Sequence, residues 1–244
     1  MPGQHKTWDI LRQYGPADAF HQRVPHRDTG HEVWVRTIPR PALVLGSTQP
    51  VELIKHTRAT ADGIEVCKRR SGGGLVWINP ETDVWIDVVV PADSPRWSSD
   101  IGRSFHWLGE VWAETLRQTI SQTDGLAADT IQVTRGSGPR TPAGTLWCYA
   151  DLGHGEVTVG DAKVVGLSQR RTRTWARLQG LMLGRWPGAA LADYVDMEVA
   201  SSLSDNPDLV ALDPSNVAAG LPAEVDVPEP RTVIDTFLRL LTET

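Results

Sequence analysis

The sequence predicts a single α/β domain of the α+β kind, with a central mixed or antiparallel sheet flanked by helices. Three observations support this prediction: apolar, β-branched runs such as VWIDVVVP at residues 84–91, a long amphipathic pattern at 98–122, and a length of 244 residues, which suits one large domain. No internal repeat and no separate second domain is evident. We expect a core within residues 30–200 and a C-terminal wrapping segment and helix over 201–244.

The composition predicts a globular protein of the cytoplasm that binds neither nucleic acid nor membrane. Hydrophobic residues make up 40% of the chain, and the formal net charge of −6 argues against a protein that acts on nucleic acid. The two cysteines, Cys67 and Cys148, imply no disulfide framework. The first residues lack the apolar core of a signal peptide, and no apolar run is long enough to cross a bilayer.

Residues 7–40 predict a short helical beginning followed by a strand in EVWVRTI, which alternates between apolar and polar residues. His21, His26 and His31 lie in the polar stretch before that strand. No cysteine or carboxylate completes a recognisable ligand spacing around them. We therefore expect solvated surface histidines rather than a metal site.

A buried strand is predicted at Ala42–Leu45, ending at Gly46. The polar group Ser47–Gln49 follows, and polar residues just beyond a buried strand are well placed to line a pocket, although most such turns are only turns. A helix-like segment at 51–61 comes next.

The loop KRRSGGGLV, residues 68–76, carries the clearest chemical signal, between the strand-like runs GIEVC and LVWI. Glycines 72–74 leave the backbone bare, so it can adopt positive φ and approach a ligand closely. Bare amides at such a turn attract anions, and the planar guanidinium groups of Arg69 and Arg70 suit phosphate or carboxylate oxygens. We interpret the loop as a cradle for a nucleotide or an acyl phosphate. The alternative is a glycine-rich hairpin with solvated arginines.

The strand at 84–91 carries one charge, Asp87, which must meet an arginine or a ligand if it is buried, or face water at an edge. The pattern at 98–122 repeats at three and four residues, as in a helix that packs on a sheet. A short strand, IQVT, and a glycine- and proline-rich loop at 135–144 follow.

A second informative region spans residues 146–183. LWCY looks like a strand carrying Cys148, and EVTVGDAKVVG resembles a hairpin that turns at Gly160 and Asp161. Lys163 begins its second strand. Such a lysine is usually a solvated edge residue, but two basic clusters in an acidic chain suggest that both face one anionic ligand. Beyond them we expect a helix at 184–196, a loop over Ser201 to Pro230 and a helix over Thr232 to Leu241.

The order of these motifs resembles the lipoate-protein ligase and octanoyltransferase group of the biotin/lipoyl ligase superfamily. PALVLGSTQ matches a strand ending in glycine and glutamine, residues 69–74 match an arginine-arginine-x-glycine-glycine-glycine loop, and KVVGLSQRR at 163–171 matches a lysine hairpin except at Leu167. Three further positions differ from the family pattern: Ile78 and Asn79 replace histidine and aspartate, and Gln179 replaces the histidine before Gly180. These changes put the acyl substrate and catalytic competence in question.

The resemblance implies an enzyme that activates lipoate or octanoate with ATP to acyl-AMP and passes the acyl group to a lysine of a lipoyl-domain acceptor protein. The catalytic group would be Lys163, which would hold the carboxyl and α-phosphate oxygens, and Mg²⁺ would accompany the pyrophosphate. The residues expected to bind substrate or nucleotide are Arg69, Arg70, Ser71, Gly72, Gly73, Gly74, Asn79, Gly166, Ser168 and Gln169.

The family that this sequence resembles has a second branch, which transfers octanoyl through a cysteine thioester without ATP. Cys148, Glu156 and Lys163 occur here in the order found in that branch. A buried, unreactive cysteine is the alternative. The third glycine of the loop favours the ligase, because the transferases more often carry arginine there. A catalytically degenerate member that only binds an acyl-adenylate or a lipoyl domain is a third hypothesis.

Overall fold

The computed structural model describes residues 7–120, 128–203 and 210–243. The strands are β1 (Asp9–Tyr14), β2 (Glu32–Thr37), β3 (Ala42–Leu45), β4 (Glu65–Lys68), β5 (Val76–Ile78), β6 (Val84–Pro91), β7 (Ile131–Val133), β8 (Val157–Val159), β9 (Ala162–Arg171) and β10 (Trp175–Met182). The α-helices are α1 (Ala17–Gln22), α2 (His56–Ala61), α3 (His106–Thr119), α4 (Pro142–Leu146), α5 (Met197–Ser202) and α6 (Pro230–Glu243). Short 3₁₀ turns occupy Val51–Leu53, Arg103–Phe105, Ala128–Thr130, Gly188–Tyr194 and Pro214–Asn216.

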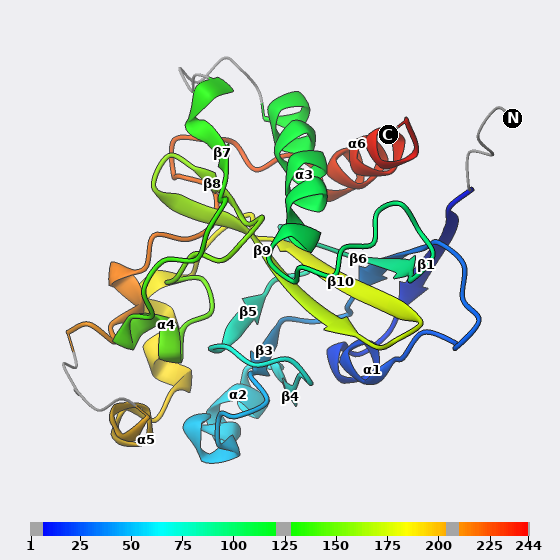
Figure 1. The fold of residues 1–244 in the computed structure, drawn as a ribbon. Helices are drawn as coiled ribbons and strands as arrows, with labels where there is room; N and C mark the ends of the chain where they lie inside the picture. The colour runs from blue at the N-terminus through cyan, green and yellow to red at the C-terminus, as the bar shows by residue number, and fades with distance from the viewer. Residues whose placement is uncertain (1–6, 121–127, 204–209, 244) are drawn as a thin grey trace, which may run out of the picture.

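Two sheets organise the described part of the chain (Figure 1). The larger has the order β1-β2-β6-β10-β9-β8-β7, with β1 and β2 parallel and every other neighbouring pair antiparallel. The smaller has the order β4-β3-β5, with β3 parallel to β4 and antiparallel to β5. This arrangement confirms the predicted α/β class with a mixed sheet and flanking helices.

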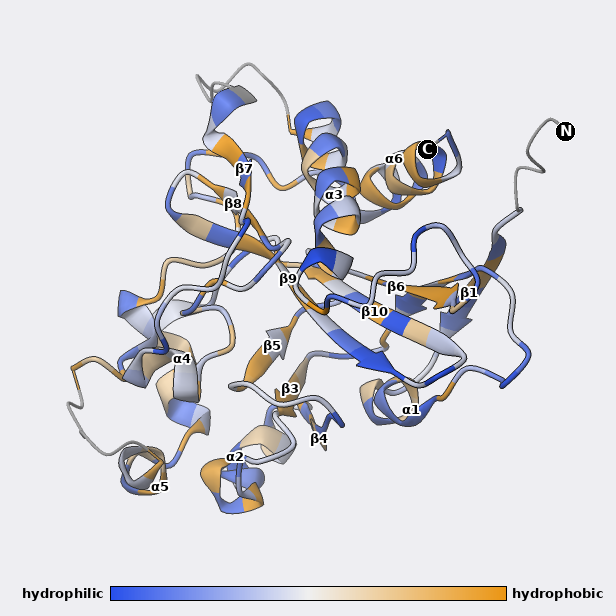
Figure 2. Cartoon of the chain, viewed as in Figure 1, coloured by the Kyte–Doolittle hydropathy of each residue, from blue (hydrophilic) through white to orange (hydrophobic). Residues whose placement is uncertain are grey.

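Helices α3 and α6 lie side by side against the larger sheet (Figure 1). The apolar positions of α3 repeat every three or four residues, so Leu108, Trp112 and Leu116 fall on one buried face. The ring of Phe237 on α6 lies 4.5 Å from that of Trp112. Figure 2 shows β6 as hydrophobic, whereas the tip of the β9–β10 hairpin is hydrophilic. Among the described residues, no helix combines the length and apolarity needed to span a bilayer.

A buried ion cluster joins three strands to α1. The carboxylate of Asp87 on β6 is fully buried and accepts hydrogen bonds from Arg36 Nε on β2 at 3.2 Å and Arg177 Nη2 on β10 at 2.6 Å. Arg177 also donates to the carbonyls of Phe20 and Arg23, which fixes α1 across the sheet. Of the alternatives for Asp87, the arginine partner is the one observed.

The strands β3 and β6 have the predicted bounds, the hairpin turns at Gly160 as expected, and α6 extends the predicted C-terminal helix. Part of the predicted 98–122 helix, residues 121 and 122, lies outside the described residues. The described helix occupies the middle of that span, after a 3₁₀ turn. The helix expected at 184–196 is a 3₁₀ segment, and a 3₁₀ turn and α2 divide the segment at 51–61.

Other predictions were wrong. The short helix expected at the beginning of residues 7–40 comes later than the first residues, as α1, and residues 9–14 form a strand that pairs in parallel with β2. His21 and His31 are buried, His31 beside the hydroxyl of Ser94 at 2.7 Å. The segment at 146–149 is not a strand, because Pro142 begins a helix capped by Thr141 that continues to Leu146.

Candidate active site

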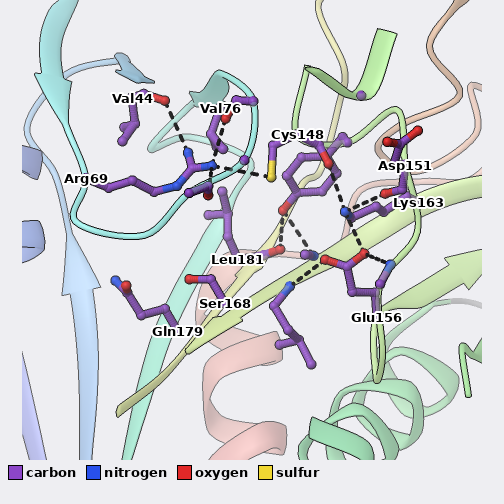
Figure 3. A pocket seen from close by; sticks show the side chains of 18 of the residues that line it. Val44, Arg69, Val76, Cys148, Asp151, Glu156, Lys163, Ser168, Gln179 and Leu181 are labelled. Atoms are coloured by element: carbon purple, nitrogen blue, oxygen red, sulfur yellow. Dashed lines mark hydrogen bonds and ion pairs between the residues drawn. The ribbon is translucent and has the colours of Figure 1, made fainter. Parts of the chain in front are cut away.

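One cavity of about 440 Å³ lies between the glycine loop, the segment after α4 and the hairpin β9–β10 (Figure 3). It therefore joins the two basic regions that the sequence singled out, which lie about ninety residues apart in the chain. Of the predicted site residues, those that line it are Arg69, Gly72, Gly73, Gly74, Cys148, Lys163, Gly166 and Ser168.

The glycine loop is not the turn of a hairpin, because β3 lies between the two strands that it connects. The guanidinium of Arg69 holds the loop in place from inside. Its Nη2 donates to the carbonyls of Gly74 at 2.7 Å and Gly72 at 2.9 Å, and its Nη1 donates to Val44 at 3.3 Å. Arg69 is 6% exposed. This arginine therefore shapes the cradle more than it offers a free charge.

A left-handed backbone conformation and a close approach of two main chains both require glycine in this region. Gly73 has φ of 96°, a left-handed conformation, and a Cβ on Gly46 would overlap the carbonyl oxygen of Gly73. Gln49 fixes the same region, because its side chain accepts from Gly46 N at 3.0 Å and donates to the carbonyl of Leu146 at 3.1 Å. Of the predicted polar group at 47–49, Thr48 lines the cavity.

An isolated β-bridge joins the segment that carries Cys148 to the glycine loop and places this residue at the cavity. The backbone N–H of Leu75 donates to the Leu146 carbonyl at 2.6 Å, and that of Cys148 donates to the Leu75 carbonyl at 2.9 Å. The thiol is partly buried, with Arg69 Nη2 3.7 Å from Sγ. Cys148 is therefore not sealed in the core.

Lys163 is a buried cation, not a solvated edge residue. It is 3% exposed, and its Nζ lies 2.7 Å from Glu156 Oε2 and donates to the carbonyls of Cys148 and Asp151, both at 2.9 Å. Its backbone pairs with the C-terminal segment, which covers the edge of the strand at this point. Glu156 is itself held by the N–H groups of Gly153 and Leu167. The ammonium therefore has a fixed position at the cavity wall (Figure 3).

Four predicted residues do not line the cavity. Arg70 is exposed, and its Nε donates to Gln22. The carbonyl of Ser71 accepts from Ser47, and Asn79 shapes a turn in which its side chain accepts from Glu81 N at 3.1 Å. Gln169 faces the opposite side of β9 from Ser168, as strand alternation requires, and lies 3.4 Å from the Ser104 hydroxyl.

Sequence reasoning missed His21 and Trp85 as cavity residues, and it noted Gln179 only as a departure from the family pattern. Burial lowers the pKa of His21 from 6.5 to about 3, with Asp87 opposing the shift and Arg177 adding to it. Gln179 could have been found from the register, because it pairs with Ser168. The sequence gives no comparable signal for His21, because the contacts of Arg177 with α1, and not a local pattern, place this residue at the cavity.

The loop before α4 also contributes to the cavity, through Ser137, Gly138 and Arg140. Asp151 anchors this loop, because its carboxylate accepts from Thr141 N at 3.1 Å and from the Thr141 hydroxyl at 2.6 Å. No group of three His, Cys, Asp or Glu side chains within the described ranges is arranged to hold a metal ion.

Comparison with known proteins gives a consistent picture of the family. Residues 16–236 match the model of the lipoyl protein ligase A/B catalytic domain. No curated protein sequence matches. A putative lipoate protein ligase of T. acidophilum, solved with bound lipoic acid, superposes with a TM-score of 0.66 at 16% identity, over 96% of this chain and 84% of that one.

Two further solved structures share the fold. A bi-partite lipoate protein ligase from Thermoplasma acidophilum, studied with its E2 lipoyl domain, gives a TM-score of 0.65 at 18% identity, covering 98% of this chain and 84% of that one. A lipoate-protein ligase A bound with ATP gives 0.59 at 16% identity, covering 96% and 84%. Because the family model spans nearly the whole sequence, this chain belongs to the lipoyl protein ligase A/B catalytic-domain family.

Proposed function

We propose that this protein is an ATP-dependent lipoate-protein ligase that activates lipoate, octanoate or a related acid and transfers the acyl group to a lysine of a lipoyl domain. The observation that carries the proposal is that the cation of Lys163 and the bare amides of Gly72–Gly74 line one cavity. The solved structures that share the fold include proteins with bound lipoic acid and with bound ATP, which supports the same pair of substrates.

In the proposed first step, a carboxylate oxygen of the acid attacks the α-phosphorus of ATP and the bond to pyrophosphate breaks. Two anionic groups must approach each other, so fixed positive charge is needed where they meet. Lys163 lies at the cavity wall with Glu156 as its counter-ion, and Arg140 adds a second cation there. The amides of Gly72–Gly74 would bind phosphate oxygens.

In the second step, the neutral amine of the acceptor lysine attacks the acyl carbonyl, AMP leaves with the bonding electrons and the amine loses a proton. The acceptor would be a lipoyl domain, as in the Thermoplasma acidophilum system. Mg²⁺ would be held mainly by the phosphates, since it usually takes few ligands from the protein and keeps several waters. The absence of a three-residue metal cluster among the described residues is compatible with that mode.

Pyrophosphate exchange into ATP tests the proposal. Exchange should depend on added lipoate or octanoate and should fall by at least a hundredfold, roughly, in Lys163→Met, which keeps the volume of the side chain and removes its charge. The matched control is Lys55→Met, because Lys55 is exposed and does not line the cavity. No acid-dependent exchange with any short or medium acid would refute the ligase assignment.

A cysteine-dependent octanoyl or lipoyl transferase is the second candidate, favoured by the position of the Cys148 thiol at the cavity wall beside Arg69. A cysteine sulfur that opens into a substrate cavity can attack an acyl carbonyl and carry the acyl group as a thioester. This candidate requires ATP-independent acyl transfer, a thioester trapped on Cys148 and loss of transfer in Cys148→Ser. The ligase instead requires that Cys148→Ser retains exchange. Binding of nucleotide without either activity would identify a degenerate binding member.

A further inference from the structure

Among the described residues, the cavity wall has one cation whose hydrogen-bond donors are free. The charged side chains of the wall are three cations, Arg69, Arg140 and Lys163, and two carboxylates, so the wall is net positive in a chain whose net charge is −6. The guanidinium of Arg69 donates to three carbonyls, and the ammonium of Lys163 is enclosed by Glu156 and two carbonyls. Arg140 is exposed and makes no hydrogen bond or ion pair within the part of the chain that the structure describes.

The backbone on both sides of Arg140 is fixed. The N–H of Gly138 donates to the carbonyl of Leu152 at 3.2 Å, and the Thr141 hydroxyl donates to the carboxylate of Asp151 at 2.6 Å. Arg140 therefore extends from a tethered stretch of chain, and its side chain is the part that can turn toward a ligand. An anion bound there needs little reorganisation of the main chain.

Helix α4 places Arg140 near the glycine loop. The helix begins at Pro142 and is five residues long, which corresponds to about 7.5 Å. At its other end, the carbonyl of Leu146 accepts from the N–H of Leu75 at 2.6 Å, directly after glycines 72–74. Within the described ranges, no group accepts a hydrogen bond from the N–H of any of these three glycines. The loop amides and the guanidinium of Arg140 are therefore placed to bind different oxygens of one ligand.

The apolar part of the cavity wall lies on another side. Val44 and Val76 belong to the smaller sheet, and Figure 3 shows them across Cys148 from Asp151, to which the Arg140 loop is tied. An alkyl chain is stabilised among such side chains, whereas a charged group would lose its hydration there. The tail of a bound acid and the anion held by Arg140 should therefore occupy different parts of the cavity.

The number of free donors favours a phosphate over a carboxylate at Arg140. A guanidinium binds both anions through two parallel N–H groups, and that fork alone satisfies the two oxygens of a carboxylate. A phosphate has further oxygens. The hydroxyl and N–H of Ser137, which also lines the cavity, have no partner among the described residues and can donate to them, as can the amides of Gly72–Gly74.

We propose, on the basis of the function proposed above, that Arg140 is a phosphate-binding residue of the cavity. Its guanidinium holds a phosphate group of the substrate, with Ser137 and the glycine-loop amides as further donors. In the ligase this phosphate belongs to ATP. In the transferase it would belong to a thioester donor whose arm carries a phosphate, as phosphopantetheine does.

Titration calorimetry of the full chain with octanoate and with a non-hydrolysable ATP analogue tests the inference. We expect Arg140→Gln to weaken binding of the analogue about tenfold or more, because charge-assisted hydrogen bonds are lost, and to leave octanoate binding unchanged. Arg140→Lys keeps the charge without the fork and should recover part of the loss. The matched control is Arg135→Gln in the same loop, because Arg135 pairs with Glu110 and does not line the cavity. It should leave both affinities unchanged.

Three results would overturn the inference: unchanged binding of the analogue in Arg140→Gln, weaker binding of octanoate to the same or a greater extent, or an equal loss in Arg135→Gln. The ligase proposal would still stand if acid-dependent exchange is observed.

If the wild type binds no nucleotide, the ligase proposal fails and a second pair of ligands decides the role of Arg140. Arg140→Gln should then weaken binding of octanoyl-phosphopantetheine and not of octanoyl-pantetheine, which lacks the phosphate. Equal effects on the two thioesters would overturn the inference, and so would a wild type that binds neither of them.

Discussion

The ammonium of Lys163 and the carboxylate of Glu156 form a buried ion pair, with 2.7 Å between Nζ and Oε2 and less than a tenth of either side chain exposed. The remaining N–H groups of Lys163 donate to main-chain carbonyls, and the carboxylate of Glu156 accepts from two backbone N–H groups. The pair is therefore fully satisfied, and Glu156 acts as the positioning residue for Lys163.

Breaking this pair from either side should destabilise the fold. Glu156→Gln and Lys163→Met should each lower the free energy of unfolding by about 3 kcal/mol, because each leaves the other charge buried without its partner. The double variant should lose less than the sum, since it leaves no uncompensated charge. Urea denaturation of the four proteins measures the coupling, and additive losses would show that the two side chains act independently.

Arg69 and Arg70 should differ sharply although they are adjacent. Arg69→Ala leaves the carbonyls of Val44, Gly72 and Gly74 without their donor, so we expect a loss of about 2–3 kcal/mol in stability and weaker binding of acid and nucleotide. Arg70→Ala should change stability by less than about 0.5 kcal/mol, because the side chain is exposed. Thermal denaturation and titration of both variants test this, and a larger effect for Arg70→Ala would contradict it.

The contact between the end of β3 and the glycine loop should tolerate a methyl group at Gly72 and not at Gly46. Gly46→Ala would drive Cβ into the carbonyl oxygen of Gly73, where only backbone movement gives relief, so we expect a loss of roughly 2 kcal/mol or more. The control is Gly72→Ala, whose Cβ would meet nothing within 4 Å. The free energies of unfolding of the two variants decide the matter; comparable values would mean that the loop can move away from β3.

Acid should destabilise the protein through His21. Its pKa is about 3 when folded and 6.5 in the reference state, so the unfolded chain binds the proton more readily between these values. The stability that neutral His21 confers is complete above pH 6.5 and falls as pH decreases. Between pH 7 and pH 5 the wild type should lose about 2 kcal/mol relative to His21→Phe. Denaturant titrations at both pH values measure this difference, and parallel losses in the two proteins would exclude His21 as the source.

The local sequence pattern was sufficient to predict those elements whose conformation depends on their own residues. The strands β3 and β6 are continuous apolar runs, and the turn at Gly160 needs the positive φ that glycine supplies. The β9–β10 turn was missed because it contains no glycine or asparagine. It is built instead by the hydroxyl of Thr172, which accepts from the N–H groups of Thr174 and Trp175.

The site was predictable as a pair of regions and less so as a set of side chains. The glycine loop and the lysine hairpin were identified from sequence, and they do share a cavity. The sequence could not show which of Arg69 and Arg70 points inward, since the two neighbouring residues have the same side chain. It also could not place His21, because that position depends on the contacts of Arg177 with α1 across the sheet.

The burial of Lys163 has a consequence for an enzyme that makes activated acyl groups. Such reagents acylate any amine with an available lone pair, and the chain contains only four lysines against twenty arginines. The Nζ of Lys163 is enclosed by the Glu156 carboxylate and two carbonyls, so an acyl carbon would have to displace these partners to reach it. The cation next to the proposed reaction centre is thereby protected from self-modification, and the acyl group remains available for the incoming acceptor.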